Sequence, residues 1–365
     1  MTMILQMLKI KEVFMNLDFN NFIKEAIQNP VLLVIMFLIL GVIFVNGWID
    51  APNSIATSVS THSIKPKNAL IMAGIFNFLG VFVMSFISTN VAKTMYNMVN
   101  FGNDNNISLI AICSAMIAVI IWVMLAWHFG FPTSQSHALV AGISGASIAV
   151  YKSMNGINYE EWKKVIYGLI ISVIFGFILG YFFTKVIEKI CRKMDRRKTI
   201  PFFKKTQVIS GAAMTFMNAA QDSQKFAGIF LLGVFLANNV TSTDSLSMPI
   251  WLMFLISTAM TVGTFIGGYK VIKTIGTKIT KLEPYQGTAA DLGASTALLV
   301  SSLTGIPIST GHTKVTSIMG VGAAKRLSKV NWKMVKNLVW AWILTFPGCG
   351  LFAYLITRLS LNIFI

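Results

Sequence analysis

The chain has 365 residues, of which 55% are hydrophobic and only 12% are charged, and its mean hydropathy is +0.69. This composition excludes an ordinary soluble domain, in which about a quarter of the residues carry a charge. The formal net charge of +17 does not indicate nucleic-acid binding, because the basic residues cluster in short loops between apolar runs. The runs are long enough to cross a lipid bilayer, so the sequence predicts an all-α polytopic membrane protein.

Ten apolar segments follow one another along the chain, after a lead-in of residues 1–30. The segments are 31–49, 69–89, 107–128, 129–151 and 165–184 in the first half, and 207–238, 248–268, 287–306, 307–324 and 337–357 in the second. An odd number of segments per half makes the second half enter the membrane upside down. We therefore expect two inverted repeats, residues 31–184 and 207–365, joined by the basic linker 185–206.

The loop charges alternate along the chain. The connections 61–68, 185–206, 269–286 and 325–336 carry net charges of +2, +7, +3 and +5, whereas the intervening loops and the two terminal segments each carry between −1 and +1. Cytoplasmic loops of membrane proteins are enriched in Lys and Arg. We therefore expect a multi-pass protein of the plasma membrane with a cytoplasmic linker and two external termini.

An acidic motif occurs once in each half. Asn46-Gly-Trp-Ile-Asp50 in the first half is echoed by Asn218-Ala-Ala-Gln-Asp222 in the second. Carboxylate and amide oxygens suit a hard cation such as Na⁺, and a buried Asp serves equally well as a proton carrier. An Asp at an interfacial helix end is the alternative, which the recurrence disfavours for the motif but which stays open for Asp291. The candidate cation-coupling residues are Asn46, Asp50, Asn53, Asn218, Gln221, Asp222, Gln224 and Asp291, with Asp50, Asn53 and Asp222 as candidate Na⁺ ligands.

A second motif also occurs twice, in the same order and at nearly the same spacing. Gly130-Phe-Pro-Thr-Ser-Gln-Ser-His137 is echoed by Gly305-Ile-Pro-Ile-Ser-Thr-Gly-His312. Pro and Gly interrupt helices, so each copy predicts a broken helix or a re-entrant hairpin, with a kinked helix as the alternative. A helix that starts at such a break offers free N–H groups and hydroxyls to an oxyanion, unless these residues act only as N-caps. The candidate substrate-binding residues are Thr133, Ser134, Gln135, Ser136, Ser309, Thr310, Asn53, Lys225 and Lys314.

Two lysines and two histidines lie close to these motifs. Lys225 follows Asp222 by three residues, on the same helical face. Lys314 lies in an otherwise uncharged segment. Each lysine either neutralises a bound oxyanion or a neighbouring Asp, or reaches toward an interface, and standing in for a coupling cation is a further alternative for Lys314. His137 and His312 either relay protons, touch substrate, or pack between helices.

No cofactor is expected, because Cys113, Cys191 and Cys349 lack the paired spacing of metal ligands. The chain also contains none of the common catalytic motifs, so we do not expect an enzyme. An intramembrane enzyme would not need paired motifs, and an anion channel would not need cation ligands, so both are weaker alternatives. A homodimer is left open.

Several strings of residues resemble signatures of the PiT family of inorganic phosphate transporters. The resemblance implies an inverted-repeat fold whose hairpins meet near mid-membrane, and phosphate uptake driven by Na⁺ or H⁺. It also implies that Asp50, Asn53, Asp222, Ser134, Ser136, Ser309 and Thr310 line a shared site. Departures from the family pattern, including Gly311 and Lys314, keep sulfate as an alternative substrate. The strings are 46–57, 130–137, 216–228, 305–312, 319–324 and 340–347.

Overall fold

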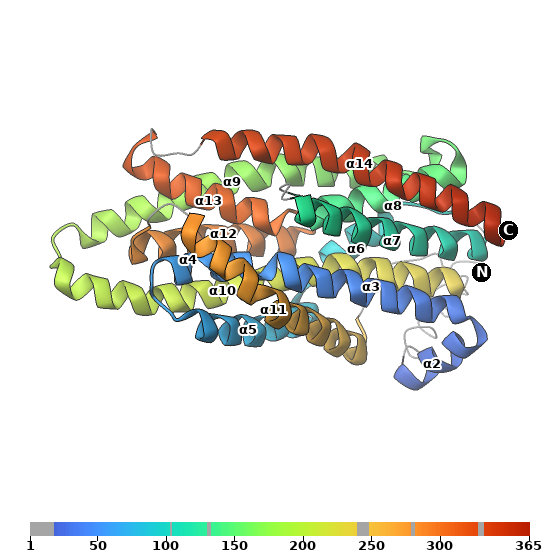
Figure 1. Cartoon of the computed structure of the whole chain (residues 1–365), viewed down its shortest axis with the longest axis horizontal. Coiled ribbons are helices and arrows are strands. Elements are labelled where there is room, and N and C mark those ends of the chain that lie inside the picture. The colour runs from blue at the N-terminus through green and yellow to red at the C-terminus, as the bar shows by residue number, and fades with distance from the viewer. Residues whose placement is uncertain (1–17, 103, 130–132, 239–247, 279–281, 328–331) are drawn as a thin grey trace, which may run out of the picture.

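The computed structural model describes residues 18–102, 104–129, 133–238, 248–278, 282–327 and 332–365. Within these ranges the chain is helical and forms no named strand (Figure 1). The helices are α2 (Phe19–Gln28), α3 (Pro30–Ile49), α4 (Ala51–Ser60), α5 (Pro66–Ile87), α6 (Asn90–Asn97), α7 (Asn105–Phe129), α8 (Gln135–Tyr151), α9 (Tyr159–Cys191), α10 (Arg196–Ala237), α11 (Ile250–Lys278), α12 (Pro284–Thr304), α13 (Thr310–Lys325) and α14 (Trp332–Phe364), with a 3₁₀ turn at Met154–Gly156.

Six helical stretches in the described part of the chain are long and apolar enough to cross a membrane. They are α3 together with α4, then α5, α7, α9, and parts of α11 and α14. Large apolar side chains such as Phe86, Ile174 and Leu355 are exposed on these helices, as expected of surfaces that face lipid. The predicted all-α polytopic membrane fold is confirmed.

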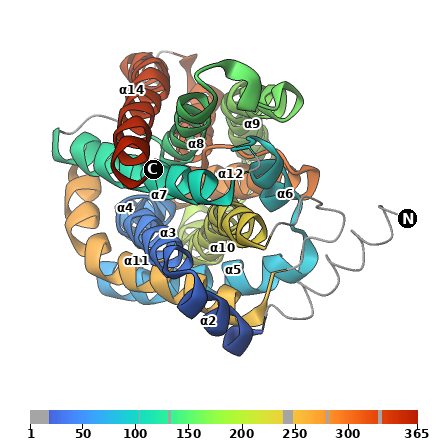
Figure 2. The same cartoon turned by 90° about the vertical axis from the view of Figure 1, so that its right-hand side faces the viewer.

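Helix α10 lies in the middle of the molecule (Figure 2) and contacts α3, α5, α6, α7 and α12. Every residue from Met217 to Phe235 is buried. The helix has 42 residues, which at about 1.5 Å per residue gives about 60 Å, twice the thickness of the hydrocarbon layer. The predicted linker 185–206 is therefore largely helical, because α9 runs to Cys191 and α10 begins at Arg196.

Figure 1 shows where the helix ends that border the predicted loops lie in the molecule. The helix ends that border the basic connections, those of α4/α5, α9/α10, α11/α12 and α13/α14, gather at the left-hand end of that view. The start of α3 and the end of α14 lie at the other end. The basic charge is thus concentrated at one end, as the loop charges predict.

Both Gly/Pro/Ser motifs coincide with interrupted helices. Helix α12 ends at Thr304. Its C-cap, Gly305, has a φ of 75°, a left-handed conformation that favours glycine, and α13 begins only at Thr310. In the first half α7 ends at Phe129 and α8 begins at Gln135, although 130–132 lie outside the described residues. Helix α7 packs on α8, and α12 packs on α13. The two hairpins enter from opposite ends of the molecule (Figure 1).

Helices from opposite halves of the chain pack together closely. Helix α5 packs on α10, and α11 packs on α3. Gly80 of α5 lies against the backbone of Phe216, and Gly263 of α11 lies against the backbone of Phe44, leaving no room for a side chain. Phe44 and Phe216 are separated along the chain by the same interval as Asp50 and Asp222. Both backbone contacts join the first half of the chain to the second.

Candidate functional site

The centre of the site is an ion pair inside α10. The Lys225 ammonium lies 2.7 Å from Asp222 Oδ1, and both side chains are almost fully buried. The ammonium also donates to Ser136 Oγ and to the carbonyl oxygen of Ile308, each at 2.6 Å. All three ammonium protons therefore have acceptors. Through them, α10 is joined to the first turn of α8 and to the break before α13.

The second oxygen of Asp222 connects two further elements. Asp222 Oδ2 accepts hydrogen bonds from Asn46 Nδ2 of α3, at 3.3 Å, and from Thr310 Oγ1 of α13, at 3.1 Å. The asparagine of the first acidic motif thus contacts the aspartate of the second. The structure brings together two copies of a motif that lie in different halves of the sequence.

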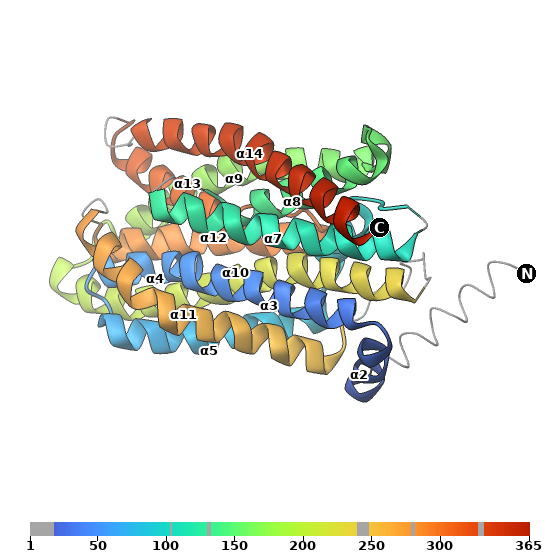
Figure 3. The same ribbon diagram turned by 45° about the vertical axis from the view of Figure 1, so that its right-hand side comes forward.

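Asp50 lies between α3 and α4, and α4 continues from α3 along nearly the same direction (Figure 3). Pro52 cannot donate a backbone hydrogen bond, which weakens the helix at this point, and Asn53 Nδ2 donates to the Ile49 carbonyl at 3.5 Å. Asp50 Oδ1 lies 4.0 Å from the position that a Cβ on Gly311 would take. The first turn of α13 therefore lies beside Asp50.

The charges in this region do not balance. The Lys225 ammonium pairs with Asp222, and Asp50 lies within electrostatic range of both groups without an ion pair of its own among the described residues. In addition, the buried amide oxygen Oδ1 of Asn46 has no hydrogen-bond partner among the described residues. Uncompensated buried charge and unpaired buried oxygens cost free energy unless an ion or water satisfies them. Carboxylate and amide oxygens are suitable ligands for Na⁺, and a proton on Asp50 would also neutralise the excess charge.

The two helix breaks meet at their histidines. The rings of His137 and His312 are 5.0 Å apart between centroids, so the first turns of α8 and α13 are neighbours. Ser309 caps α13 by accepting a hydrogen bond from the His312 backbone N–H at 3.3 Å. Two helix N-termini, with their N–H groups and positive dipole ends, thus lie beside Ser136 and Lys225. Free N–H groups and positive dipole ends are the features of a helix N-terminus that attract anions.

Not every predicted residue lies at this centre. Gln135 Nε2 donates to the Val42 carbonyl of α3 at 2.7 Å, and the Thr133 hydroxyl bonds to Thr345 of α14 at 3.1 Å. Gln221 Nε2 donates to the Ile306 carbonyl at 3.0 Å, where it holds the break after α12. Ser134, the N-cap of α8, is buried, and so are Asn218 and Gln224 of α10.

Asp291 and Lys314 form a second buried ion pair, between α12 and α13. Thr57 Oγ1 of α4 donates to Asp291 Oδ1 at 2.8 Å and accepts from the Lys314 ammonium at 3.0 Å. Asp291 is fully buried and lies two turns inside α12, so its carboxylate is not exposed at the end of the helix. Lys314 lies one turn beyond Thr310 on α13, so the two ion pairs are neighbours along that helix.

The remaining partners of Asp291 come from α10. Asp291 Oδ2 accepts from Gln207 Nε2 at 2.5 Å and from Ser210 Oγ at 3.3 Å. These two residues and Thr57 were not among the predicted site residues. Thr57 is the last residue of the first acidic signature and lies two turns after Asp50, which is the one signal in the sequence that points to it.

Residues 46–353 match the profile of the phosphate transporter family. The chain belongs to this family. A probable low-affinity inorganic phosphate transporter of Bacillus subtilis (strain 168) is 34% identical over 90% of this chain and 99% of its own length. A probable low-affinity inorganic phosphate transporter of Rhizobium meliloti (strain 1021) is 32% identical over 89% of this chain and 95% of its own length.

A solved structure, that of a sodium-dependent phosphate transporter, has a similar fold. The TM-score is 0.82 at 22% sequence identity, and the match covers 92% of this chain and 100% of the other. The resemblance seen in the sequence motifs is confirmed by the family match, and so is the prediction that the chain is a transport protein and not an enzyme.

Proposed function

We propose that this chain is a secondary transporter that carries inorganic phosphate across the plasma membrane together with Na⁺ or H⁺. The observation that supports this most directly is the position of the Lys225 ammonium. It bonds to Asp222, a candidate cation ligand, and to both helix breaks, which are candidate phosphate ligands. A cation and an oxyanion bound here would affect one another directly.

Coupling arises from charge in this proposal. Without a cation, Asp50 and Asp222 together carry more charge than Lys225 compensates, and they repel an incoming phosphate. A Na⁺ ion held by Asp50, Asp222 and the amide oxygen of Asn46, or a proton on Asp50, removes that repulsion. Phosphate then accepts hydrogen bonds from the Ser136 hydroxyl and from the N–H groups that begin α8 and α13, beside the positive charge of Lys225. Each ligand strengthens the binding of the other.

Movement follows from the arrangement of the two hairpins. The α7–α8 hairpin enters from one end of the molecule and the α12–α13 hairpin from the other (Figure 1). Rocking one inverted repeat, 31–184, against the other, 207–365, exposes the shared site to each side in turn. The end that carries the basic loops faces the cytoplasm in this proposal, and both termini are external.

The chemistry of the site favours phosphate over sulfate. A carboxylate accepts hydrogen bonds and cannot donate them. Phosphate keeps an O–H group at neutral pH and can donate it to Asp50 or Asp222, whereas sulfate has no proton to donate. The two relatives described above are also named for phosphate.

The proposal is tested with the purified protein in proteoliposomes. Uptake of radiolabelled phosphate and sulfate is measured under an imposed Na⁺ gradient, an imposed proton gradient, and neither. We expect phosphate to accumulate under one of the two gradients and sulfate to remain near the level of empty liposomes. Equal uptake of phosphate and sulfate would contradict the proposal. So would phosphate uptake that is the same with a Na⁺ gradient, with a proton gradient and with neither.

A further inference from the structure

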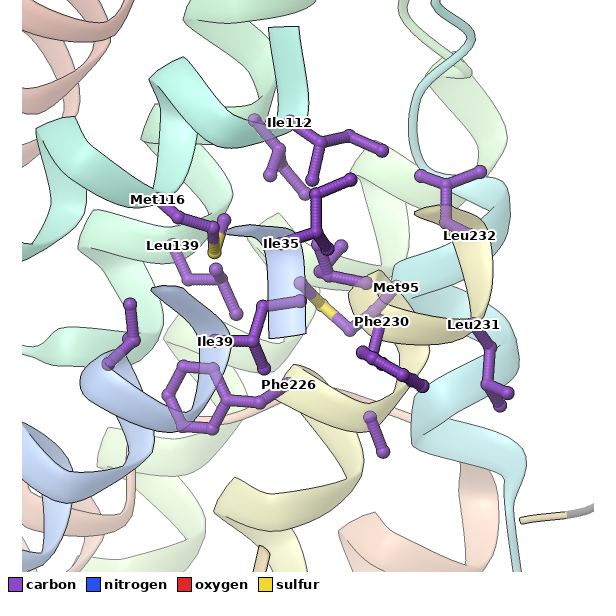
Figure 4. Close-up of a cluster of buried hydrophobic side chains, with 14 of the residues drawn as sticks. Ile35, Ile39, Met95, Ile112, Met116, Leu139, Phe226, Phe230, Leu231 and Leu232 are labelled. Atoms are coloured by element: carbon purple, nitrogen blue, oxygen red, sulfur yellow. The ribbon is translucent and has the colours of Figure 1, made fainter. Parts of the chain in front are cut away.

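The second ion pair breaks the symmetry between the two hairpins. Helices α7 and α12 end at residues 129 and 304, and α8 and α13 begin at residues 135 and 310, so the two hairpins correspond at one constant offset. This offset places Met116 at the position equivalent to Asp291, and Leu139 at the position equivalent to Lys314. Met116 and Leu139 are both fully buried members of the main hydrophobic cluster (Figure 4). The hairpin geometry is therefore compatible with an apolar pair at these positions.

A buried ion pair is seldom favourable compared with apolar side chains of similar size, because both charges lose their hydration. The α7–α8 hairpin has the apolar pair Met116 and Leu139 at these positions, whereas the α12–α13 hairpin has the ion pair Asp291 and Lys314. The side chains around Asp291 also supply hydrogen-bond donors to both oxygens of its carboxylate. One carboxylate oxygen is bonded by Thr57 and Lys314, and the other by Gln207 and Ser210. These observations point to a role for the charge beyond holding the helices together.

We propose that the Lys314 ammonium is a tethered cation, which permanently occupies an oxygen-lined site formed by Asp291 and Thr57 that would otherwise bind a free Na⁺ ion. This inference rests on the proposed function, because it concerns the number of ions that accompany phosphate. Carboxylate and hydroxyl oxygens are ligands for alkali cations as well as for ammonium. Because the Lys314 side chain cannot dissociate from the protein, its ammonium neutralises Asp291 throughout the transport cycle. It therefore adds no ion to the number that is transported with each phosphate.

Of the roles that the sequence leaves open for Lys314, this inference selects the stand-in for a cation over direct contact with the oxyanion. The ammonium lies against Asp291 and Thr57, whereas Lys225 contacts the two helix breaks. The two lysines then have distinct tasks: Lys225 serves the substrate site, and Lys314 replaces an ion.

The test replaces Lys314 by a short neutral side chain and then supplies free Na⁺. In Lys314→Ala and Lys314→Ser, the Asp291 carboxylate loses the ammonium that neutralises it. The shorter side chain also leaves a cavity beside Asp291 that a Na⁺ ion can enter. The melting temperature of the purified full-length protein is measured in NaCl and in N-methylglucamine chloride at equal ionic strength. Mass action predicts that Na⁺ raises the melting temperature of both variants by more than it does for the wild-type protein. In proteoliposomes, the variants should require one additional Na⁺ per phosphate.

Two matched controls use the symmetry of the hairpins. Asp291→Met combined with Lys314→Leu copies the apolar pair of the first hairpin, and its Na⁺ response should equal that of the wild type because the carboxylate is gone. Leu139→Ala opens a cavity at the equivalent position without a carboxylate, so it should lower the melting temperature without adding a Na⁺ response.

The outcomes separate this inference from the proposed function, because the melting temperature does not require transport. Recovery of folded Lys314→Ala only when Na⁺ is present would support the tethered cation. The inference is overturned if both lysine variants respond to Na⁺ no more than the wild type. It is also overturned if neither variant folds even with Na⁺ while the apolar double variant does.

Discussion

Lys225 and Asp222 lie one turn apart on α10, and the Lys225 ammonium donates to the Asp222 carboxylate at 2.7 Å. The same ammonium reaches Ser136 from the first half of the chain and the carbonyl of Ile308 from the second. A change at this lysine should therefore affect both folding and transport, and the two effects can be separated.

Lys225→Met should abolish phosphate uptake and destabilise the protein. The substitution leaves a buried carboxylate without its partner, which typically costs about 3–5 kcal/mol. Combining it with Asp222→Asn removes the unpaired charge and should restore most of the lost melting temperature, while uptake stays absent. Melting temperature in detergent and uptake in proteoliposomes are the two measurements. Recovery of uptake in the double variant would show that neither charge is needed for transport.

Asp50→Asn and Asp222→Asn should each abolish gradient-driven uptake in a protein that still folds, although Asp222→Asn also leaves the buried Lys225 ammonium without its carboxylate and should lower the melting temperature. Each substitution preserves the shape of the side chain but removes a charge that attracts the coupling cation or carries the proton. The matched control is Asp18→Asn, because Asp18 is exposed and its side chain does not cap α2. Normal uptake by both site variants, measured with equal amounts of reconstituted protein, would refute the assignment.

Gly145→Ala should be much more disruptive than Gly350→Ala, although the two glycines face one another between α8 and α14. A Cβ on Gly145 would overlap the backbone of Gly350, whereas a Cβ on Gly350 would meet only the Ala141 carbonyl oxygen, at an ordinary 3.5 Å. Overpacking of this kind costs about 1–3 kcal/mol. Thermal unfolding of the two variants provides the comparison, and similar melting temperatures would contradict this packing.

The topology can be read from thiol labelling in intact cells. In a variant without the three native cysteines, a cysteine at Lys198, in the basic first turns of α10, should resist an impermeant maleimide. A cysteine at Met154, an exposed residue of the 3₁₀ turn at the opposite end, should react. Permeabilised cells give the maximum for each position. Labelling at Lys198 alone would reverse the proposed orientation.

Much of the arrangement was predictable because its motifs occur twice in the chain. The duplicated motifs around Asp50 and Asp222, and the two helix breaks, indicate a common site before any contact is known. The pairing of Asn46 with Asp222 across the halves agrees with that expectation. The loop charges likewise predicted which helix ends lie together.

The surroundings of Asp291 were not predictable in the same way. Thr57, Gln207 and Ser210 come from α4 and α10 and lie 81 to 234 residues from Asp291 in the sequence. Ser, Thr and Gln in a helix are common and carry no sign of a distant partner. The continuation of α10 through the predicted linker was missed because its charged first turns resemble a loop in sequence, whereas a helix can extend beyond the membrane without being apolar.

The close packing of helices from opposite halves also bears on how the chain is made. Helix α3 ends at Ile49, whereas its partner α11 begins only at Ile250. At a synthesis rate of about 5–20 residues per second, α3 is made about 10–40 s before its partner. During that interval the surface of α3 at Gly47, which later packs against the backbone of Met260, has no partner from α11. A chain truncated after the first half should therefore be recognised as incomplete and degraded.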